Sequence, residues 1–70
     1  MTLQNAAEGR EYRVKSVRTG DGETDAFLYS LGCCPGEAVT VIARRKGGCT
    51  VAIKDGRYNL DPHLAATIEV

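Results

Sequence analysis

Hydrophobic and polar residues alternate along most of this chain, which is the period of β-strands that bury one face. The strands predicted from this pattern cover residues 11–18, 38–46, 49–54, 57–60 and 67–70. The middle three are joined by Gly47-Gly48 and Asp55-Gly56, pairs that are typical of tight hairpin turns. The pattern therefore predicts a three-stranded antiparallel meander in the second half of the chain.

Two short segments follow the helical period instead. Apolar residues recur at the spacing of one helix face over residues 25–31, with Thr24 or Asp25 as the expected N-cap. Gly32 can end this helix in the left-handed conformation. Near the end of the chain, the Asp-Pro pair at positions 61–62 predicts one capped helical turn.

The order of elements predicts a mainly β fold: a small SH3-like five-stranded barrel with a short inserted helix and a terminal helical turn. The first and last strands are free to pair and close the sheet. We expect residues 1–8 to be poorly ordered, residues 20–24 to form a turn or mobile loop, and residues 9–70 to form one domain. The predicted core consists of Val14, Leu28, Leu31, Val39, Val41, Val51, Ile53, Leu60, Ala65 and Ile68.

Composition narrows the classes of function. A chain of 70 residues buries only about 60% of the surface that it exposes when unfolded, so its apolar side chains are needed for the core and a large cleft is not expected. Nine basic and nine acidic residues give a net charge of zero, which favours neither nucleic acid nor an anionic membrane as a partner. No signal peptide and no run of about 20 apolar residues is present, so we expect a cytoplasmic protein that does not span a membrane.

Catalytic residues are not predicted. His63 is the only histidine, and the chain has neither a glycine-rich phosphate loop nor a nucleophile elbow. Cys33 or Cys34 could pair with His63 as nucleophile and base, but adjacent cysteines near a helix end are more often small core residues. We therefore do not expect an enzyme.

A metal site is a weaker alternative. Cys33, Cys34, Cys49 and His63 are four suitable ligands, yet adjacent cysteines point apart in an extended chain, and zinc sites usually space two thiolates by two to four residues. Strand alternation also places Cys49 with the core. The three cysteines are expected to be free thiols, because their number is odd and the cytoplasm is reducing. No resident cofactor is predicted, and transient contact with a transition metal stays open.

A basic triplet, Arg44-Arg45-Lys46, is the one feature that suggests nucleic acid. No pair of aromatic residues on adjacent strands offers a platform for stacking bases. A solvated hairpin tip explains the triplet more simply, so nucleic acid is not expected as a partner.

Residues 27–36 need a more specific explanation, because they place a helix end and a Pro-Gly turn directly before a valine-rich strand. This segment resembles the FeoA family, whose pattern is approximately Arg-Leu-x-x-Leu-Gly-Leu-x-Pro-Gly. The matching residues are Leu28, Leu31, Gly32, Pro35 and Gly36. The family's C-terminal pattern is also similar to Gly56 through Leu60, followed by Ala65, Ile68 and Val70, so the resemblance covers about residues 9–70.

Three positions depart from the family pattern. Phe27 stands where the family usually has Arg, Cys33 replaces a large aliphatic residue, and Asp61 stands where an Arg commonly follows the penultimate strand. The resemblance implies an SH3-like fold without catalysis and a role in Fe(II) uptake, exerted by docking to the cytosolic part of an FeoB-type permease. The departures weaken the transfer of partner contacts that depend on the basic residues. The alternative is an isolated SH3-like domain of the kind found in metal-dependent transcriptional repressors.

The inserted helix and the turn after it are the expected contact region, because a barrel closes without them. Phe27 and Tyr29 lie about 200° apart around a helix axis, so at least one of them is expected to be exposed. The predicted partner-binding residues are Phe27, Tyr29, Cys33 and Pro35. The competing interpretation is that Phe27 covers the open end of the barrel and Tyr29 is merely solvated. The oligomeric state is not predicted.

Overall fold

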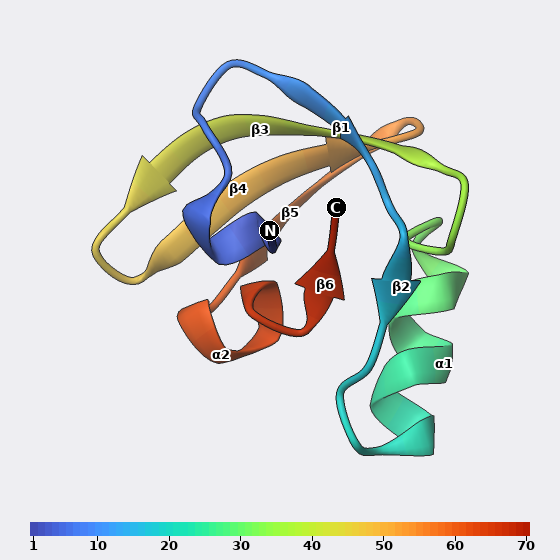
Figure 1. Ribbon diagram of the computed structural model, residues 1–70. Helices are drawn as coiled ribbons and strands as arrows, with labels where there is room; N and C mark the ends of the chain where they lie inside the picture. The colour runs from blue at the N-terminus through green and yellow to red at the C-terminus, as the bar shows by residue number, and fades with distance from the viewer.

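Two antiparallel sheets form the framework of the protein in a computed structural model that describes residues 1–70 (Figure 1). The larger sheet has the strand order β1-β3-β4-β5, and the smaller one pairs β2 with β6. The strands are β1 (Glu11–Arg13), β2 (Ser16–Val17), β3 (Ala38–Arg45), β4 (Gly48–Ile53), β5 (Gly56–Leu60) and β6 (Ile68–Glu69). The helices are the 3₁₀ turn η1 (Leu3–Asn5), α1 (Gly22–Ser30) and α2 (Pro62–Ala65).

The predicted first strand divides into β1 and β2 because its backbone changes partners. The Val14 N–H donates to the Glu37 carbonyl on the β3 side at 2.9 Å, whereas the Lys15 N–H donates to the Glu69 carbonyl in β6 at 2.7 Å. The predicted pairing of the first and last strands is therefore confirmed, through β2 and β6. The prediction of five strands in one closed sheet is wrong: β5 and β6 do not pair, and six short strands form two sheets.

The three-stranded meander β3–β4–β5 is confirmed, and it contains a bulge that the alternation did not indicate. The register between β3 and β4 shifts at Ile42, so that Ala43 lies opposite Thr50 and Arg44 lies opposite the buried Cys49. A bulge of this kind reverses which side of the strand each following residue faces. Strict alternation along the strand would place Ala43 on the same face as Val41. Because of the bulge, Arg44 takes that place instead.

Arg44 uses this orientation to hold the N-terminal segment. Its Nη1 donates to the carbonyls of Leu3 at 3.0 Å and Ala6 at 2.9 Å, and its Nη2 donates to the Gln4 carbonyl. Its backbone N–H donates to the Glu8 carboxylate at 2.7 Å. The first residue of the basic triplet is thus a structural residue rather than a free cation at a hairpin tip.

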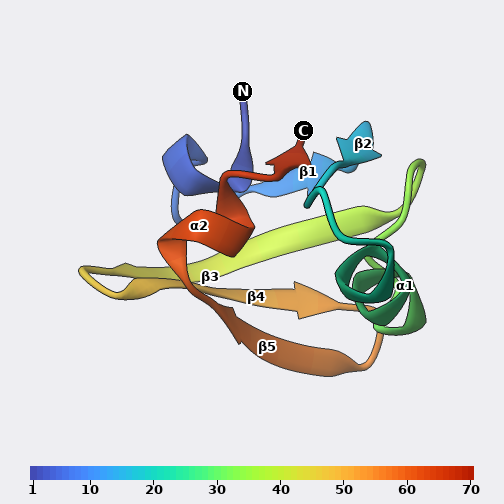
Figure 2. The same cartoon turned by 90° about the horizontal axis from the view of Figure 1, so that it is seen from below.

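The first eight residues, which were expected to be poorly ordered, pack against the rest of the chain. Leu3 is completely buried and Ala6 is 2% exposed, on the side of the large sheet that also carries α2 (Figure 2). The Val70 N–H donates to the Met1 carbonyl at 2.9 Å, which ties the two ends of the chain together. A single leucine in a polar stretch has no periodicity, so the sequence pattern contained no signal for this packing.

Replacing Arg44 by Ala is expected to lower the free energy of unfolding by about 2 kcal/mol, because three carbonyls lose a charged donor. Urea unfolding measures the loss, and amide hydrogen exchange is expected to accelerate selectively over residues 2–8. Arg45→Ala removes the same charge from an exposed neighbour and serves as the control. Equal losses in both variants would contradict the structural role of Arg44.

The core is a single cluster of 15 buried apolar residues without any buried polar side chain. Every residue predicted for the core is buried except Leu31, which is only half-buried and packs against the cluster. The core also contains residues that were not in the prediction: Leu3, Ala6, Val17, Cys33, Cys49 and Val70. Of these, strand alternation places Cys49 with the core, and the interpretation of adjacent cysteines as small core residues is confirmed for Cys33.

Candidate functional site

Helix α1 begins three residues before its predicted start. Asp21 is the N-cap, and its carboxylate accepts hydrogen bonds from the Thr24 hydroxyl at 2.6 Å and the Glu23 N–H at 3.3 Å. The Thr24 bond, helped by the Glu23 bond, holds the pKa of Asp21 below its ordinary value. Asp25, one of the two predicted caps, instead accepts from the Thr19 hydroxyl at 2.6 Å. Gly22 suggested a loop, but the first turn of a helix tolerates a glycine, so the turn predicted for residues 20–24 is only partly correct.

The end of α1 was predicted correctly and is rigidly built. Gly32 has φ +96°, its N–H donates to the Tyr29 carbonyl, and the Cys33 N–H donates to the Leu28 carbonyl, both at 3.0 Å. This pair of bonds is the Schellman motif, which brings the residue after the glycine back over the last turn. Leu28 and Cys33 are both completely buried. They anchor the end of the helix in the core.

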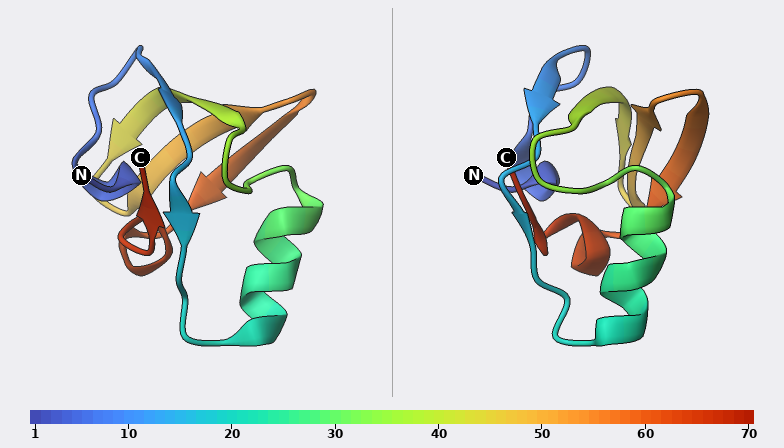
Figure 3. Two further views of the ribbon diagram at one scale, coloured as in Figure 1. Left: turned by 45° about the vertical axis from the view of Figure 1, so that its right-hand side comes forward. Right: turned by 90° about the vertical axis from the view of Figure 1, so that its right-hand side faces the viewer.

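Both aromatic residues of α1 face solvent. Phe27 is 58% exposed and Tyr29 is 46% exposed, and Leu28 between them is the one fully buried residue of the helix. At least one exposed ring was expected, and the structure shows two. Phe27 does not cover the end of the barrel, so that part of the competing interpretation is wrong. Helix α1 stands beside the sheets and leaves most of its circumference uncovered (Figure 3).

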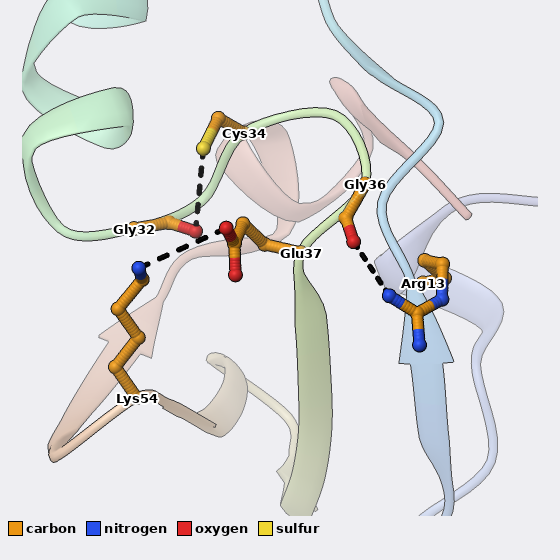
Figure 4. Close-up of polar contacts among 6 residues, drawn as sticks. All are labelled: Arg13, Gly32, Cys34, Gly36, Glu37 and Lys54. Atoms are coloured by element: carbon orange, nitrogen blue, oxygen red, sulfur yellow. Dashed lines mark hydrogen bonds and ion pairs between the residues drawn. The ribbon is translucent and has the colours of Figure 1, made fainter.

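The loop that follows α1 is held by several polar contacts (Figure 4). The Gly36 carbonyl accepts from Arg13 Nη1 at 2.6 Å, and the Gly36 N–H donates to the Val14 carbonyl at 2.9 Å. The Cys34 thiol lies 3.8 Å from the Gly32 carbonyl, to which it donates. These contacts hold the loop in place while Pro35, at its tip, stays exposed.

An ion pair joins this loop to the next hairpin. Lys54 Nζ lies 3.7 Å from Glu37 Oε1, and the Lys54 side chain is largely exposed while that of Glu37 is partly exposed. The aliphatic part of Lys54 also covers Gly32, where an added Cβ would lie 3.0 Å from the Lys54 Cε. Solvent screens an exposed pair of this kind, so it positions the loop more than it stabilises the fold.

Three of the four predicted contact residues are exposed, although the rings of Phe27 and Tyr29 project from nearly opposite sides of the helix. Phe27, Tyr29 and Pro35 are exposed on α1 and the loop, and we call them the α1 surface. Cys33 was grouped with them but lies in the core, because the Schellman motif turns it inward. Burial, and to a lesser degree the neighbouring Cys34, raises the pKa of Cys33 to about 11, so its thiol stays protonated near neutral pH.

The structure does not assemble the alternative metal ligands. Cys49 lies in β4, where burial raises its pKa, and His63 lies in α2. No group of three or more Cys, His, Asp or Glu residues is close enough to hold a metal ion. The buried and protonated Cys33 thiol is also a poor nucleophile. These residues therefore do not form the thiolate cluster that was considered from the sequence.

The largest hollow lies away from the α1 surface, and no pattern in the sequence indicates it. It is an open depression of about 620 Å³ between the β3–β4 hairpin, the end of β5 and α2. Arg45, Asn59 and Asp61 contribute polar groups to its lining. Asp61 is already occupied as the cap of α2, where its carboxylate accepts a hydrogen bond from the Leu64 N–H at 2.7 Å, as predicted for a helical turn at this position.

The three helices are short, and none has the length and apolar composition that a membrane-spanning helix requires.

Fold and surface together define the class of protein: a small two-sheet β domain with an inserted helix whose aromatic side chains are exposed. The FeoA domain model matches residues 1–70, and the chain belongs to the FeoA family. This family consists of non-catalytic accessory domains associated with ferrous iron transport, which confirms the resemblance and the expectation that the protein is not an enzyme.

Solved structures agree with this assignment. FeoA of Stenotrophomonas maltophilia complexed with zinc, described as a procaryotic SH3 domain protein, is similar with TM-score 0.82 and 26% identity over 97% of this chain and 86% of that one. An iron uptake regulatory protein, also a FeoA, has TM-score 0.81 and 20% identity over 97% of this chain and 92% of that one. The fold is therefore SH3-like, as predicted, although its sheet is not closed.

A third similar structure is a manganese-dependent transcriptional repressor, with TM-score 0.85 and 24% identity. The match covers 97% of this chain, which spans only 39% of the repressor's length. At this identity the likeness shows a shared fold. No curated protein sequence matches the chain.

Proposed function

We propose that this protein supports or regulates Fe(II) uptake in the cytoplasm by docking, through the α1 surface, onto the cytosolic part of an FeoB-type permease. The observation that supports this proposal is the pair of exposed aromatic side chains on a helix whose end is fixed in the core. Fe(II) is then the cargo of the permease, and the accessory protein needs neither a catalytic group nor a resident cofactor.

The physical argument concerns the cost of ordering the contact residues. Phe27 and Tyr29 each have only two side-chain torsions, and the capped helix already fixes their backbone, so little conformational entropy remains to be lost on binding. Aromatic residues are enriched among the few side chains that contribute most of the binding energy at protein interfaces. The fixed loop at Pro35 extends the same surface.

A second candidate function follows from the repressor match. The domain can act as the SH3-like module of a metal-dependent regulator, which would dock on a DNA-binding domain instead of a permease. The FeoA family assignment favours the permease, because the family is associated with ferrous iron transport. Parallel binding assays with the two kinds of partner distinguish these functions.

Changing Phe27 and Tyr29 together to Ser is expected to lower the affinity for the permease's cytosolic domain by at least about 30-fold, the loss expected when only one of the two residues is a contact hot spot. Calorimetry with purified proteins measures the affinity, and growth on limiting Fe(II) reports transport. Ala26→Ser, an exposed change on the same helix, is the matched control. Both variants are expected to keep the wild-type urea midpoint, because neither aromatic ring is buried. Unchanged affinity in the intact double variant would reject the α1 surface as the docking site.

A further inference from the structure

The exposed aromatic face of α1 adjoins carboxylates that no basic side chain neutralises. Glu23 is exposed, and its carboxylate takes part in no hydrogen bond or ion pair. It precedes Phe27 by four residues, so the two side chains lie on the same face of the helix, one turn apart. The only ion pair in the protein joins Lys54 to Glu37. A ring and a free carboxylate thus stand side by side on an uncovered helix face.

The first turn of α1 and its cap carry three carboxylates although the whole chain is neutral. Asp21, Glu23 and Asp25 lie within the first turn of α1 or at its cap, and the hydrogen bonds to Asp21 keep that carboxyl ionised well below neutral pH. The basic triplet, residues 44–46, lies at the tip of the β3–β4 hairpin, on the opposite side of the molecule from α1 (Figure 1). Arg18 is the nearest basic residue in sequence, and it forms no ion pair with these acids. The carboxylates of the first turn therefore attract cations to the N-terminal half of α1, whereas Lys54 and Arg13 lie at the other end, beside Gly32 and Gly36.

We infer that the α1 surface binds a cationic, arginine-containing segment of its partner. A guanidinium group stacks on the face of an aromatic ring and pairs with a carboxylate at the same time, and Phe27 with Glu23 offers both groups one helical turn apart. Tyr29 offers a second ring, on the other side of the helix, for a further basic residue. This inference rests on the proposed function, and it fits a membrane transporter, because cytoplasmic segments close to the bilayer carry an excess of Lys and Arg.

Other kinds of occupant fit the surface less well. An acidic segment would be repelled by three carboxylates within five residues. A purely apolar segment would cover Phe27 but would also remove water from the Glu23 carboxylate without giving it a partner, which is unfavourable. Only a cationic segment satisfies the rings and the carboxylates together.

The test uses a synthetic peptide of alternating Arg and Ser residues, with the same peptide carrying Glu for Arg as the negative probe. The whole protein is titrated with each peptide and its backbone amide chemical shifts are followed by NMR. The amide shifts of residues 22–36 are expected to change with the Arg peptide only. The affinity is expected to fall by about tenfold when the salt concentration rises from roughly 50 to 300 mM, since exposed charge pairs are screened. Shifts spread over the entire surface, or absent at low salt, would overturn the inference.

Three variants separate specific recognition from general attraction between charges. Glu23→Gln is expected to weaken peptide binding about threefold, whereas Glu11→Gln removes the same charge from β1 and is expected to leave it unchanged. Phe27→Leu keeps an apolar side chain without a π-system, and we expect a loss of about three- to fivefold. Equal losses in Glu23→Gln and Glu11→Gln, or full affinity in Phe27→Leu, would contradict the paired contact.

The same variants distinguish this inference from the proposed function. If the permease's cytosolic domain binds wild type and Glu23→Gln equally well but loses the Phe27 and Tyr29 double variant, the docking proposal stands and the cationic partner is wrong. If that domain does not bind wild type while the Arg peptide does, the permease is the wrong partner and the chemical preference of the α1 surface stands.

Discussion

Gly48→Ala is expected to cost more than about 4 kcal/mol of the free energy of unfolding, which is a large share of what a domain of this size holds. A Cβ at this position would overlap the Leu60 carbonyl oxygen and would lie 2.9 Å from the carbonyl carbon of the same residue. Both contacts are with backbone, so no side chain can move aside. Gly48 also has φ +131°, which L side chains rarely adopt. We expect the variant to be largely unfolded at 37 °C.

Gly47→Ala is the matched control, because it adds the same methyl group one residue earlier in the same turn. A Cβ on Gly47 meets nothing within 4 Å. The free energy of unfolding of Gly47→Ala is therefore expected to stay within about 0.5 kcal/mol of wild type, as for most surface changes. Circular dichroism and urea unfolding compare the two proteins. A folded Gly48→Ala variant with the stability of Gly47→Ala would contradict the close approach of β5 to this turn.

The hairpin itself was predictable from sequence, but the unequal roles of its two glycines were not. Two glycines between alternating runs indicate a turn, and this signal is local. The residue that excludes a Cβ at Gly48 is Leu60, twelve positions later, at the end of another strand. Which glycine is essential thus depends on how β5 approaches the turn, and a sequence pattern does not contain that distance.

The same difference between local and distant causes explains the other results for the fold. The strand ranges and the end of α1 at Gly32 follow from period and backbone preference within a few residues, and they were predicted. The partner change at Val14 depends on which strands lie on each side of the chain. The orientation of Arg44 depends on the bulge at Ile42, whose effect is visible only in the pairing of β3 with β4.

The candidate site was predictable to a similar extent. Helix geometry alone required an exposed aromatic residue at Phe27 or Tyr29, because a short helix cannot bury two rings on opposite sides. Cys33 was counted among the contact residues as part of the inserted helix and turn, whereas the interpretation of the adjacent cysteines as small core residues is the one that holds for Cys33. The Schellman motif explains this position: the Cys33 N–H donates to the Leu28 carbonyl, and this hydrogen bond brings Cys33 back to the core.

Leu28→Ala is expected to lower the free energy of unfolding by about 3 kcal/mol, within the range for a fully buried leucine whose cavity relaxes only in part. Leu28 is completely buried, whereas Leu31, which the helical period predicts to be in the core, is only half-buried, so Leu31→Ala is expected to cost less. Phe27→Ala, one residue away and 58% exposed, is the control and is expected to cost below about 0.5 kcal/mol. Urea unfolding ranks the three variants.

The loss at Leu28 also has a functional consequence, because this residue is the only fully buried side chain of α1 and holds the end of the helix together with Cys33. An isolated helix of nine residues is unstable in water, so its order depends on this anchor. In Leu28→Ala the amides of residues 22–32 are expected to exchange with solvent much faster than those of β3 and β4, and the affinity for the permease domain is expected to fall although Phe27 and Tyr29 are both present. Uniform acceleration of exchange over the whole chain would show instead that α1 and the sheets unfold as one unit, and that the α1 surface does not depend on a separate anchor.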